Sequence, residues 1–362
     1  MKSSKNFQRG RILLVSHVYH TESGPVYGPF NVIKDFLNTN KRSFQTIEYP
    51  LVSRTPLIIK SVFETVKTVM TAAVYIPKIF IGIDPLNAFA GVILKKIGLV
   101  KKTIFYCVDY TPTRFKNKIL NNIYLGIDRF VSKNSDEVWN VSSRIIDVRN
   151  KQGIPDAKIK FVPNSPVFEN CPRLPVGKVN RNNIVMVAGL THGPVLNLVL
   201  KAFKNVVTKF PKARLSIIGT GPYQEKLKEK TKKVELSKNI IFLGQLSNKD
   251  LLREVSKSAA ALAIYTFSKD YSWVYYGDSK KAREYLACGT PVIITDVVGT
   301  ADDVERYKAG LVIKPGTKDL ERAMDKMLSD KNYWLECRKN ACLLAKKYDM
   351  KKILDESFDT TL

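Results

Sequence analysis

Residues 276–296 read YGDSKKAREYLACGTPVIITD. A polar loop enters a segment from Lys280 to Ala287 that we expect to be a helix. Gly289 follows it and suits the left-handed conformation that ends many helices. A proline and the apolar run Val292–Ile294 come next, and the run predicts a buried strand. A helix that leads directly into such a strand is typical of a parallel α/β sheet.

Similar units recur along the chain in two series. In the first we expect strands at Arg11–Ser16, Lys78–Ile83, Thr103–Val108 and Val138–Val141, with helices at Pro29–Leu37 and Leu86–Ile97. In the second we expect strands at Asn183–Ala188, Leu215–Ile218, Ile240–Leu243, Ala259–Ile264, Pro291–Thr295 and Gly310–Ile313, with helices between them and a final helical stretch, Lys331–Leu362. The fold class is therefore α/β, with two Rossmann-like parallel-sheet domains facing a central cleft.

The helix at Lys280–Ala287 carries Lys281 and Glu284, three residues apart and so on one face. A cation and backbone N–H groups in the first turn suit a diphosphate, and a carboxylate one turn later suits ribose hydroxyls. Spacing alone allows a second interpretation, a capped surface helix with an ion pair between these two side chains. A nucleotide site and a surface helix both remain open at this point.

The run from Lys281 through Glu284 and Gly289 to Pro291, KAREYLACGTPVI, resembles the donor-binding signature of glycosyltransferase family 4. Members are retaining, usually metal-independent enzymes with the GT-B fold. The resemblance implies that Glu284 binds the donor ribose and that Lys281 lies near the phosphates.

Other segments resemble the same family. The turn at Gly219 (IGTGP) resembles the Gly-x-Gly-Pro turn, and IFLGQL, which contains Leu243, resembles the strand and loop whose backbone reads the base. Lys347–Ile353 resembles the terminal helix that crosses back to the first domain. The resemblance implies an acceptor domain at 1–165, a linker at 166–182, a donor domain at 183–345, and a helix at 346–362 that packs back on the acceptor domain.

Two positions depart from the family pattern. Tyr276 stands where many members have a second Glu, which contacts the donor sugar. In the loop after the first strand of the second domain, which contains Gly189 and Thr191, His192 is the only basic candidate for the phosphates. We expect these four residues to contact the donor, while the identity of the donor sugar stays open.

The first domain offers two candidate sites. The loop after its first strand contains Gly24, where a close backbone approach to donor or acceptor is expected, although an ordinary βα turn is the alternative. Asp109 follows the third strand, and the resemblance puts it near the reacting carbon as the catalytic residue. An Asp109–Arg114 ion pair or a helix cap is the alternative. His17 and His20 are ambiguous in the same way.

The net charge of +26 predicts an anionic partner. The segment Pro56–Lys102 mixes apolar residues with seven lysines, which favours docking on anionic lipid, and solvated lysines on core helices are the alternative. The five cysteines have no metal-ligand spacing, and no apolar run has the length of a signal-peptide core or a spanning helix. We expect a cytoplasmic protein, peripheral on the cytoplasmic face of the membrane where it docks.

These observations predict a retaining hexosyltransferase that uses a nucleotide sugar, UDP- or GDP-linked, and a hydroxyl acceptor on a lipid-linked or polysaccharide glycan precursor. No cofactor or metal is expected, because no suitable loop has an Asp-x-Asp pair. A GT-B sugar-nucleotide epimerase is one alternative, although the sequence offers few acid/base carboxylates. A basic nucleic-acid-binding protein is another, although no groove-reading motif is present.

Overall fold

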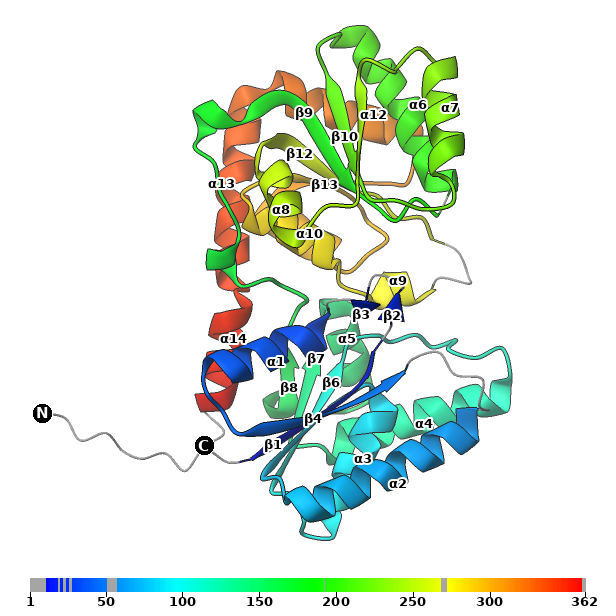
Figure 1. The fold of residues 1–362 in the computed structure, drawn as a ribbon, viewed down its shortest axis with the longest axis vertical. Coiled ribbons are helices and arrows are strands. Elements are labelled where there is room, and N and C mark those ends of the chain that lie inside the picture. Colours follow the sequence, from blue (N-terminus) through cyan, green and yellow to red (C-terminus); the bar gives the residue numbers. More distant parts are fainter. Residues whose placement is uncertain are drawn as a thin grey trace, which may run out of the picture. The chain divides into compact units, whose positions relative to one another are not determined.

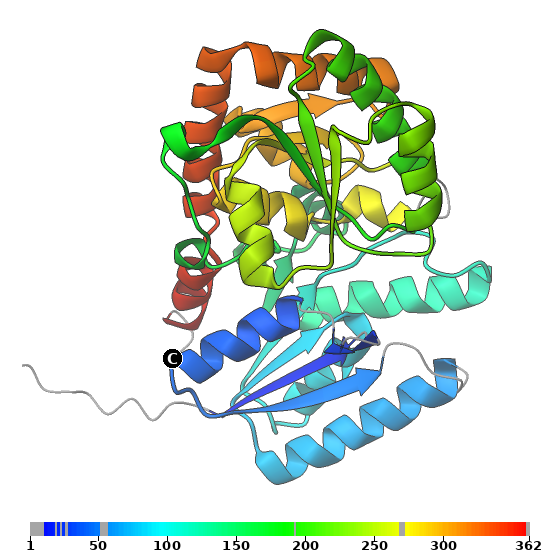
Figure 2. The same cartoon turned by 45° about the horizontal axis from the view of Figure 1, so that its top comes forward.

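The computed structural model describes residues 11–18, 20–21, 24–25, 28–50, 57–191, 193–267 and 272–359. Within these ranges the chain forms two compact units. Unit 1 comprises the described part of residues 1–163 together with that of 351–362, and unit 2 comprises that of 164–350. Figure 1 and the tilted view in Figure 2 show that each unit consists of a twisted sheet with helices packed against it.

Unit 1 contains a six-stranded parallel sheet with the strand order β4-β1-β5-β6-β7-β8. Its strands are β1 (Ile12–Val18), β4 (Phe44–Pro50), β5 (Ile79–Ile83), β6 (Lys102–Cys107), β7 (Glu137–Asn140) and β8 (Ile159–Phe161). A short antiparallel pair, β2 (His20–Thr21) and β3 (Gly24–Pro25), follows β1. The central strands are apolar and buried, as in β5, because helices cover both faces of the sheet.

The α-helices of unit 1 are α1 (Pro29–Thr39), α2 (Leu57–Tyr75), α3 (Pro85–Lys96), α4 (Lys118–Asn134), α5 (Ser143–Lys151) and α14 (Met350–Asp359), and a 3-10 turn lies at Asp156–Lys158. α1 and α14 lie together on one face, where the Phe36 and Phe358 rings stack at 5.7 Å. α2, α3 and α4 lie side by side on the other face (Figure 1).

Unit 2 contains a second six-stranded parallel sheet with the strand order β11-β10-β9-β12-β13-β14. Its strands are β9 (Asn180–Val187), β10 (Arg214–Ile218), β11 (Ile240–Gly244), β12 (Ser258–Ala263), β13 (Val292–Thr295) and β14 (Gly310–Ile313). This is the classical doubly wound order, in which the chain starts in the middle of the sheet and winds first to one edge and then to the other.

The helices of unit 2 are α6 (Gly193–Lys209), α7 (Gln224–Lys233), α8 (Asn248–Ser256), α9 (Ser272–Tyr276), α10 (Lys280–Ala287), α11 (Thr300–Tyr307), α12 (Thr317–Ser329) and α13 (Lys331–Lys347). Short 3-10 turns lie at Phe168–Asn170 and Val176–Lys178. One core layer joins the sheet to α6 and α12, and a second layer on the opposite face joins it to α8, α10 and α13. Of the helices that the structure describes, none combines the length and apolarity needed to cross a bilayer.

The structure confirms the α/β class, the two parallel sheets and each strand expected from the sequence. The expected helix at Lys280–Ala287 has those bounds as α10. The last stretch is helical as expected, and it consists of two helices, because Tyr348 and Asp349 separate α13 from α14. The sequence interpretation missed β4, which lies at one edge of the sheet and contains few buried residues. For β8, at the other edge, it gave only the strand end at Phe161.

Candidate functional site

A pocket of about 370 Å³ opens in unit 2 at the carboxyl ends of β9 and β12. These strands are neighbours, and the winding direction reverses between them, since β9 is followed by β10 on one side and β12 by β13 on the other. Open parallel sheets bind their ligands at such reversals. The pocket is lined by Met186, Val187, Ala188, Gly189, Thr191, Val195, Leu196, Ala263, Ile264, Tyr265, Thr266, Trp273, Val274 and Lys281. Gly189, Thr191 and Lys281 were expected at a donor site, and the structure brings these three together.

Lys281 reaches the pocket because it is the second residue of α10. Ser279 caps this helix, and its hydroxyl oxygen accepts a hydrogen bond from the N–H of Ala282 at 3.1 Å. The surrounding protein disfavours a buried charge and lowers the pKa of Lys281 from its ordinary 10.5, while Glu284 opposes the shift. By its accessible surface, however, Lys281 is an exposed residue. The pocket wall therefore presents a cation that can meet an entering anion.

Glu284 lies one turn further along α10 and does not line the pocket. Its carboxylate is 9% exposed and lies 3.4 Å from the ammonium of Lys280, four residues earlier. The surface-helix interpretation required a Lys281–Glu284 pair, and the partner is Lys280 instead. Burial raises the pKa of Glu284 above 4.5, and the two lysines oppose that shift. Lys281 is left outside the Lys280–Glu284 pair.

Arg283 anchors the loop before α10. Its guanidinium is 3% exposed and lies between two carboxylates, Asp278 at 2.8 Å and Asp303 at 2.6 Å, whose side chains are 0% and 5% exposed. Asp278 also accepts hydrogen bonds from the N–H of Asn164 and the hydroxyl of Thr300, both at 2.7 Å. Buried charges are retained only when they are paired and hydrogen-bonded in this way. The network fixes the residues that lead into Lys281.

Tyr285 fixes the other side of α10. The ring is fully buried, and its hydroxyl accepts a hydrogen bond from the N–H of Val187, at the end of β9, at 3.0 Å. Tyr265, in the loop after β12, forms a 2.7 Å hydrogen bond with Ser279. The residues of the signature KAREYLA therefore have different roles in the helix. Lys281 faces the pocket, Tyr285 holds α10 to the end of β9, and Arg283 ties α10 to Asp278 in the loop before it and to Asp303 of α11.

The loop after β9 packs closely against Gly219, which directly follows β10. Gly219 has a φ of +125°, and a Cβ there would lie 2.0 Å from the carbonyl oxygen of Ala188. Gly219 therefore shapes the loop that carries Gly189 and Thr191 and does not line the pocket.

Two other candidates of unit 2, Leu243 and Tyr276, are not among the residues that line the pocket. Leu243 lies in β11, an edge strand, and packs against the core. Tyr276 ends α9, 5.0 Å from the ring of Tyr275. His192, expected near the phosphates, lies outside the described residues.

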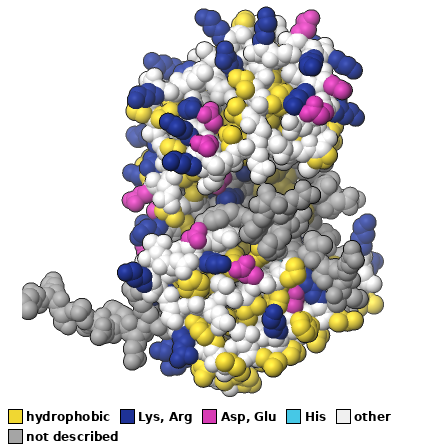
Figure 3. Space-filling model, in the orientation of Figure 1, with side chains coloured by type: hydrophobic (Ala, Val, Ile, Leu, Met, Phe, Trp, Pro, Cys, Tyr) yellow, Lys and Arg dark blue, Asp and Glu magenta, His cyan; other side chains and the backbone are white. Residues whose placement is uncertain are grey.

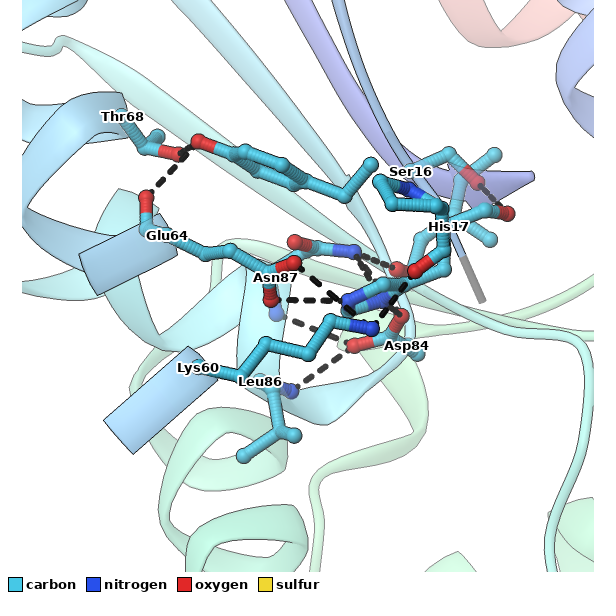
Figure 4. Close-up of polar contacts among 11 residues, drawn as sticks. Ser16, His17, Lys60, Glu64, Thr68, Asp84, Leu86 and Asn87 are labelled. Atoms are coloured by element: carbon cyan, nitrogen blue, oxygen red, sulfur yellow. Dashed lines mark hydrogen bonds and ion pairs between the residues drawn. The ribbon is translucent and has the colours of Figure 1, made fainter. Parts of the chain in front are cut away.

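Unit 1 has a polar cluster at its own reversal of strand order, between β1 and β5 (Figure 4). Nδ1 of His17, near the end of β1, lies 2.7 Å from Asp84, and Nε2 lies 3.0 Å from Glu64 of α2. The amide of Asn87 donates to Asp84 at 2.8 Å. Asp84 caps α3 through the N–H groups of Leu86 and Asn87, with an unusual φ of +76°. The structure thus holds an imidazole between two carboxylates.

Burial of His17 disfavours its charged form, but the hydrogen bonds and negative charges of Asp84 and Glu64 outweigh this effect. The pKa of His17 is therefore raised from its ordinary 6.5. His17 was an ambiguous candidate in the sequence, while Asp84 and Glu64 were missed. Asp84 directly follows a buried strand and precedes a proline, a pattern typical of a helix cap at a strand end, which would have identified it.

Asp109 lies in the segment after β6 and pairs with Arg114, whose Nη1 donates to its Oδ2 at 2.5 Å. This is the alternative that the sequence left open, and the carboxylate remains 39% exposed. Gly24 lies in β3, opposite Thr21, and the helix cap after this segment is Gly28. Gly24 is therefore not at the start of α1. Asp109 and Gly24 both belong to unit 1.

Residues 176–343 match the family described as "Glycosyl transferases group 1". An uncharacterized glycosyltransferase of Methanocaldococcus jannaschii is 26% identical over 41% of this chain and 36% of its own length. The GDP-mannose-dependent monoacylated alpha-(1-6)-phosphatidylinositol monomannoside mannosyltransferase of Corynebacterium glutamicum is 23% identical over 66% of this chain and 55% of its own length. The chain thus spans about a third to a half of the length of these curated relatives.

Solved structures resemble the whole chain in fold. Sucrose-phosphate synthase from Thermosynechococcus elongatus is 14% identical, with a TM-score of 0.71 over 98% of this chain and 99% of that one. HepE from Anabaena, in complex with UDP, is 15% identical, with a TM-score of 0.68 over 97% and 99%. The chain therefore has the GT-B fold of glycosyltransferases, and most of unit 2 matches the glycosyl transferase group 1 family.

Proposed function

We propose that this protein is a retaining glycosyltransferase of family 4 that transfers a hexose from a nucleotide sugar to a hydroxyl. The observation that carries the proposal is the pocket at the reversal between β9 and β12, with Lys281 of the signature in its wall. A bound nucleoside diphosphate would place its phosphates beside Lys281 and the backbone N–H groups around Gly189. Glu284, one turn along the same helix, would accept hydrogen bonds from the ribose.

The pKa shifts agree with this arrangement. The surrounding protein lowers the pKa of Lys281, which is itself exposed, so a bound diphosphate would supply a counter-charge that stabilises the ammonium. Donors fixed in place before the reaction stabilise the charge that develops on a leaving diphosphate better than mobile ones do. The Arg283 and Tyr285 contacts provide that rigidity. The proposed reaction uses no metal ion.

The comparisons support the choice of donor. One relative is named as GDP-mannose-dependent, and the HepE structure holds UDP. We propose a UDP- or GDP-linked hexose as the donor and a lipid-linked or polysaccharide glycan precursor as the acceptor. Gly24 and Asp109, both in unit 1, are proposed to serve the acceptor, with Asp109 as the catalytic carboxylate. Arg114, whose Nη1 donates to the carboxylate at 2.5 Å, would then hold the Asp109 side chain in place.

Product analysis tests the reaction. The protein is incubated with UDP-glucose, UDP-N-acetylglucosamine or GDP-mannose, with and without a set of alkyl glycosides, and the products are read by proton NMR. We expect one donor to give a glycoside that keeps the anomeric configuration of the donor, and only when an acceptor is present. Conversion of a sugar nucleotide alone into its epimer, or a product of inverted configuration, would refute the proposal.

Donor affinity tests the assignment of Glu284. Glu284→Gln should weaken binding of the nucleotide sugar by about tenfold or more, since a hydrogen bond to a charged group contributes about 1.5–3 kcal/mol. Glu254→Gln is the matched control, because Glu254 lies in unit 2, outside the pocket, and pairs with Lys257. If calorimetry gives the same affinity for Glu284→Gln and for the control, the ribose assignment is wrong.

A further inference from the structure

The outer side of α2 exposes a continuous apolar stripe. Six large hydrophobic side chains of this helix are between 52% and 85% exposed: Ile59, Val62, Phe63, Val66, Met70 and Val74. Their spacing follows the helical period, so they lie along one side of the helix. Figure 3 shows hydrophobic side chains gathered along the lower edge of unit 1, where Figure 1 draws α2. Hydrophobic residues exposed singly are common on proteins, but a row of six on one helix indicates an interaction surface.

A trough of about 310 Å³ continues this stripe sideways. Val62 and Val66 of α2 form one wall, Phe89 of α3 lies in the floor, and Ile123 and Ile127 of α4 form the other wall. Ile123 is 54% exposed, although it lines the trough. We call the stripe, the trough and the outer side of α4 the α2–α4 face.

The exposed charges carried by helices α2, α3 and α4 are positive. Of their seven cationic residues, Lys60 is only 11% exposed and lies beside Glu64, and Lys95 pairs with Asp136. The other five are exposed: Lys67, Lys96, Lys118, Arg129 and Lys133. The three helices contain two acidic residues, Glu64 and Asp128, and both are buried. Asp128 is neutralised by the buried Arg149 at 2.5 Å, and Glu64 contacts His17. No helical carboxylate therefore reaches the surface of these three helices.

Cations and apolar side chains meet where α2 and α3 end. Ile76 and Ile97 follow these helices and are 59% and 60% exposed. Lys78 and Lys101 are exposed beside them, and the N–H of Lys101 donates to the carbonyl of Lys78. Aliphatic side chains interspersed with lysines are typical of a helix that lies in the interface of an anionic membrane.

We propose that the α2–α4 face docks on an anionic lipid bilayer, with the stripe of α2 inserted among the lipid headgroups. The charge of the molecule selects this occupant. A second copy would bring two strongly positive surfaces together, since the net charge is +26. Nucleic acid would match the charge but would leave the aliphatic stripe in water. An anionic bilayer offers negative charge to the lysines and an apolar environment to the stripe. This docking does not depend on the transferase reaction.

Vesicle flotation tests the proposal with the whole chain of 362 residues. Vesicles of phosphatidylcholine alone are compared with vesicles in which about a third of the lipid is phosphatidylglycerol, at low and at high salt. We expect strong binding to the anionic vesicles, weak binding to the neutral ones, and weaker binding as salt screens the lysines. Equal binding to both kinds of vesicle, or binding to neither, would overturn the proposal.

The double variant Phe63→Ser, Met70→Ser removes the centre of the stripe, where the two side chains are 68% and 66% exposed. It should bind anionic vesicles at least about tenfold more weakly than the wild type, because the free energy gained by inserting apolar side chains into the bilayer is lost. The double variant Val176→Ser, Leu343→Ser is the matched control, since these unit 2 side chains are 44% and 52% exposed, and it should bind like the wild type.

Two measurements accompany the variants. Thermal unfolding and nucleotide binding in unit 2 should be unchanged in the stripe variant, because the replaced side chains are exposed and lie in unit 1. Light scattering in the absence of lipid should give the same mass for the wild type and for the stripe variant. A wild-type dimer that the stripe substitutions convert to a monomer, together with unchanged vesicle binding, would assign the face to a second copy and refute lipid docking.

Discussion

The hydroxyl of Tyr285 in α10 accepts a hydrogen bond, 3.0 Å long, from the backbone N–H of Val187 at the end of β9. This contact joins the helix that carries Lys281 to the strand that opens the pocket. Tyr285→Phe leaves the N–H of Val187 without this hydrogen-bond acceptor. The loss should lower the free energy of unfolding by about 1–3 kcal/mol. Urea denaturation measures this loss.

Tyr275→Phe is the control for that prediction. Tyr275 is 42% exposed, so its substitution should change stability by less than about 0.5 kcal/mol. A loss of similar size in both variants would mean that the Tyr285 hydroxyl does not hold α10 to β9.

The Asp278–Arg283–Asp303 network should be far more sensitive. Arg283→Met leaves two buried carboxylates, Asp278 and Asp303, without their counter-charge. We expect a loss of about 3–5 kcal/mol in the free energy of unfolding, since breaking a buried pair leaves an uncompensated charge. Denaturant unfolding of the full chain is the measurement, with Arg322→Met as the comparison. Arg322 is 78% exposed and 3.9 Å from Asp319, so its loss should cost less than about 1 kcal/mol.

The cluster around His17 predicts a dependence of stability on pH. The pKa of His17 is raised above 6.5 in the folded protein, so protonation stabilises the fold. The contribution is complete below about pH 6.5, the ordinary value, and is lost as the pH rises through the raised pKa. His17→Gln should therefore be less stable than the wild type near pH 5.5, and this deficit should shrink toward pH 9.

Thermal melting of both proteins across this range measures the effect, with the difference between them as the readout. The carboxylates Asp84 and Glu64 and the ammonium of Lys60 face the ring, and they are present in both proteins. A deficit that stays constant, or that grows with pH, would show that His17 is neutral in the folded state.

The regular parts of the fold were predictable because the physical signals are local. Continuous apolar runs such as Ile79–Ile83 predict buried parallel strands, and the helix from Lys280 was predicted from the polar loop before it and from Gly289 after it. β4 was not predicted, because it is an edge strand in which only Ile47 and Tyr49 are buried. Its place in the sheet depends on pairing with β1, which a local pattern does not encode.

The site was predictable only in part. Lys281 and Gly189 were identified from the signature and from the loop after a strand, and they line one pocket. The pairing of Glu284 with Lys280 required the helix geometry, since the sequence allowed Lys281 equally well. Trp273 was missed because α9 is a short helix with no periodic pattern. Glu64 was missed because it meets His17 only through the fold, 47 positions away in sequence.

The central claim is that the pocket of unit 2 binds a nucleoside diphosphate through Lys281. Calorimetry and thermal shift with UDP, GDP, ADP and dTDP, free and sugar-linked, test it on three proteins: the wild type, Lys281→Met and Lys318→Met. Lys318 is the matched control because it is the second residue of its own helix, α12, as Lys281 is of α10.

We predict that at least one nucleotide stabilises the wild type by about 2.7 kcal/mol at a hundredfold excess over its dissociation constant. Lys318→Met should bind it equally well, and Lys281→Met should bind about tenfold or more weakly, without loss of stability in the unliganded protein. If no nucleotide binds the wild type, or if Lys281→Met binds as the control does, the pocket is not the donor site.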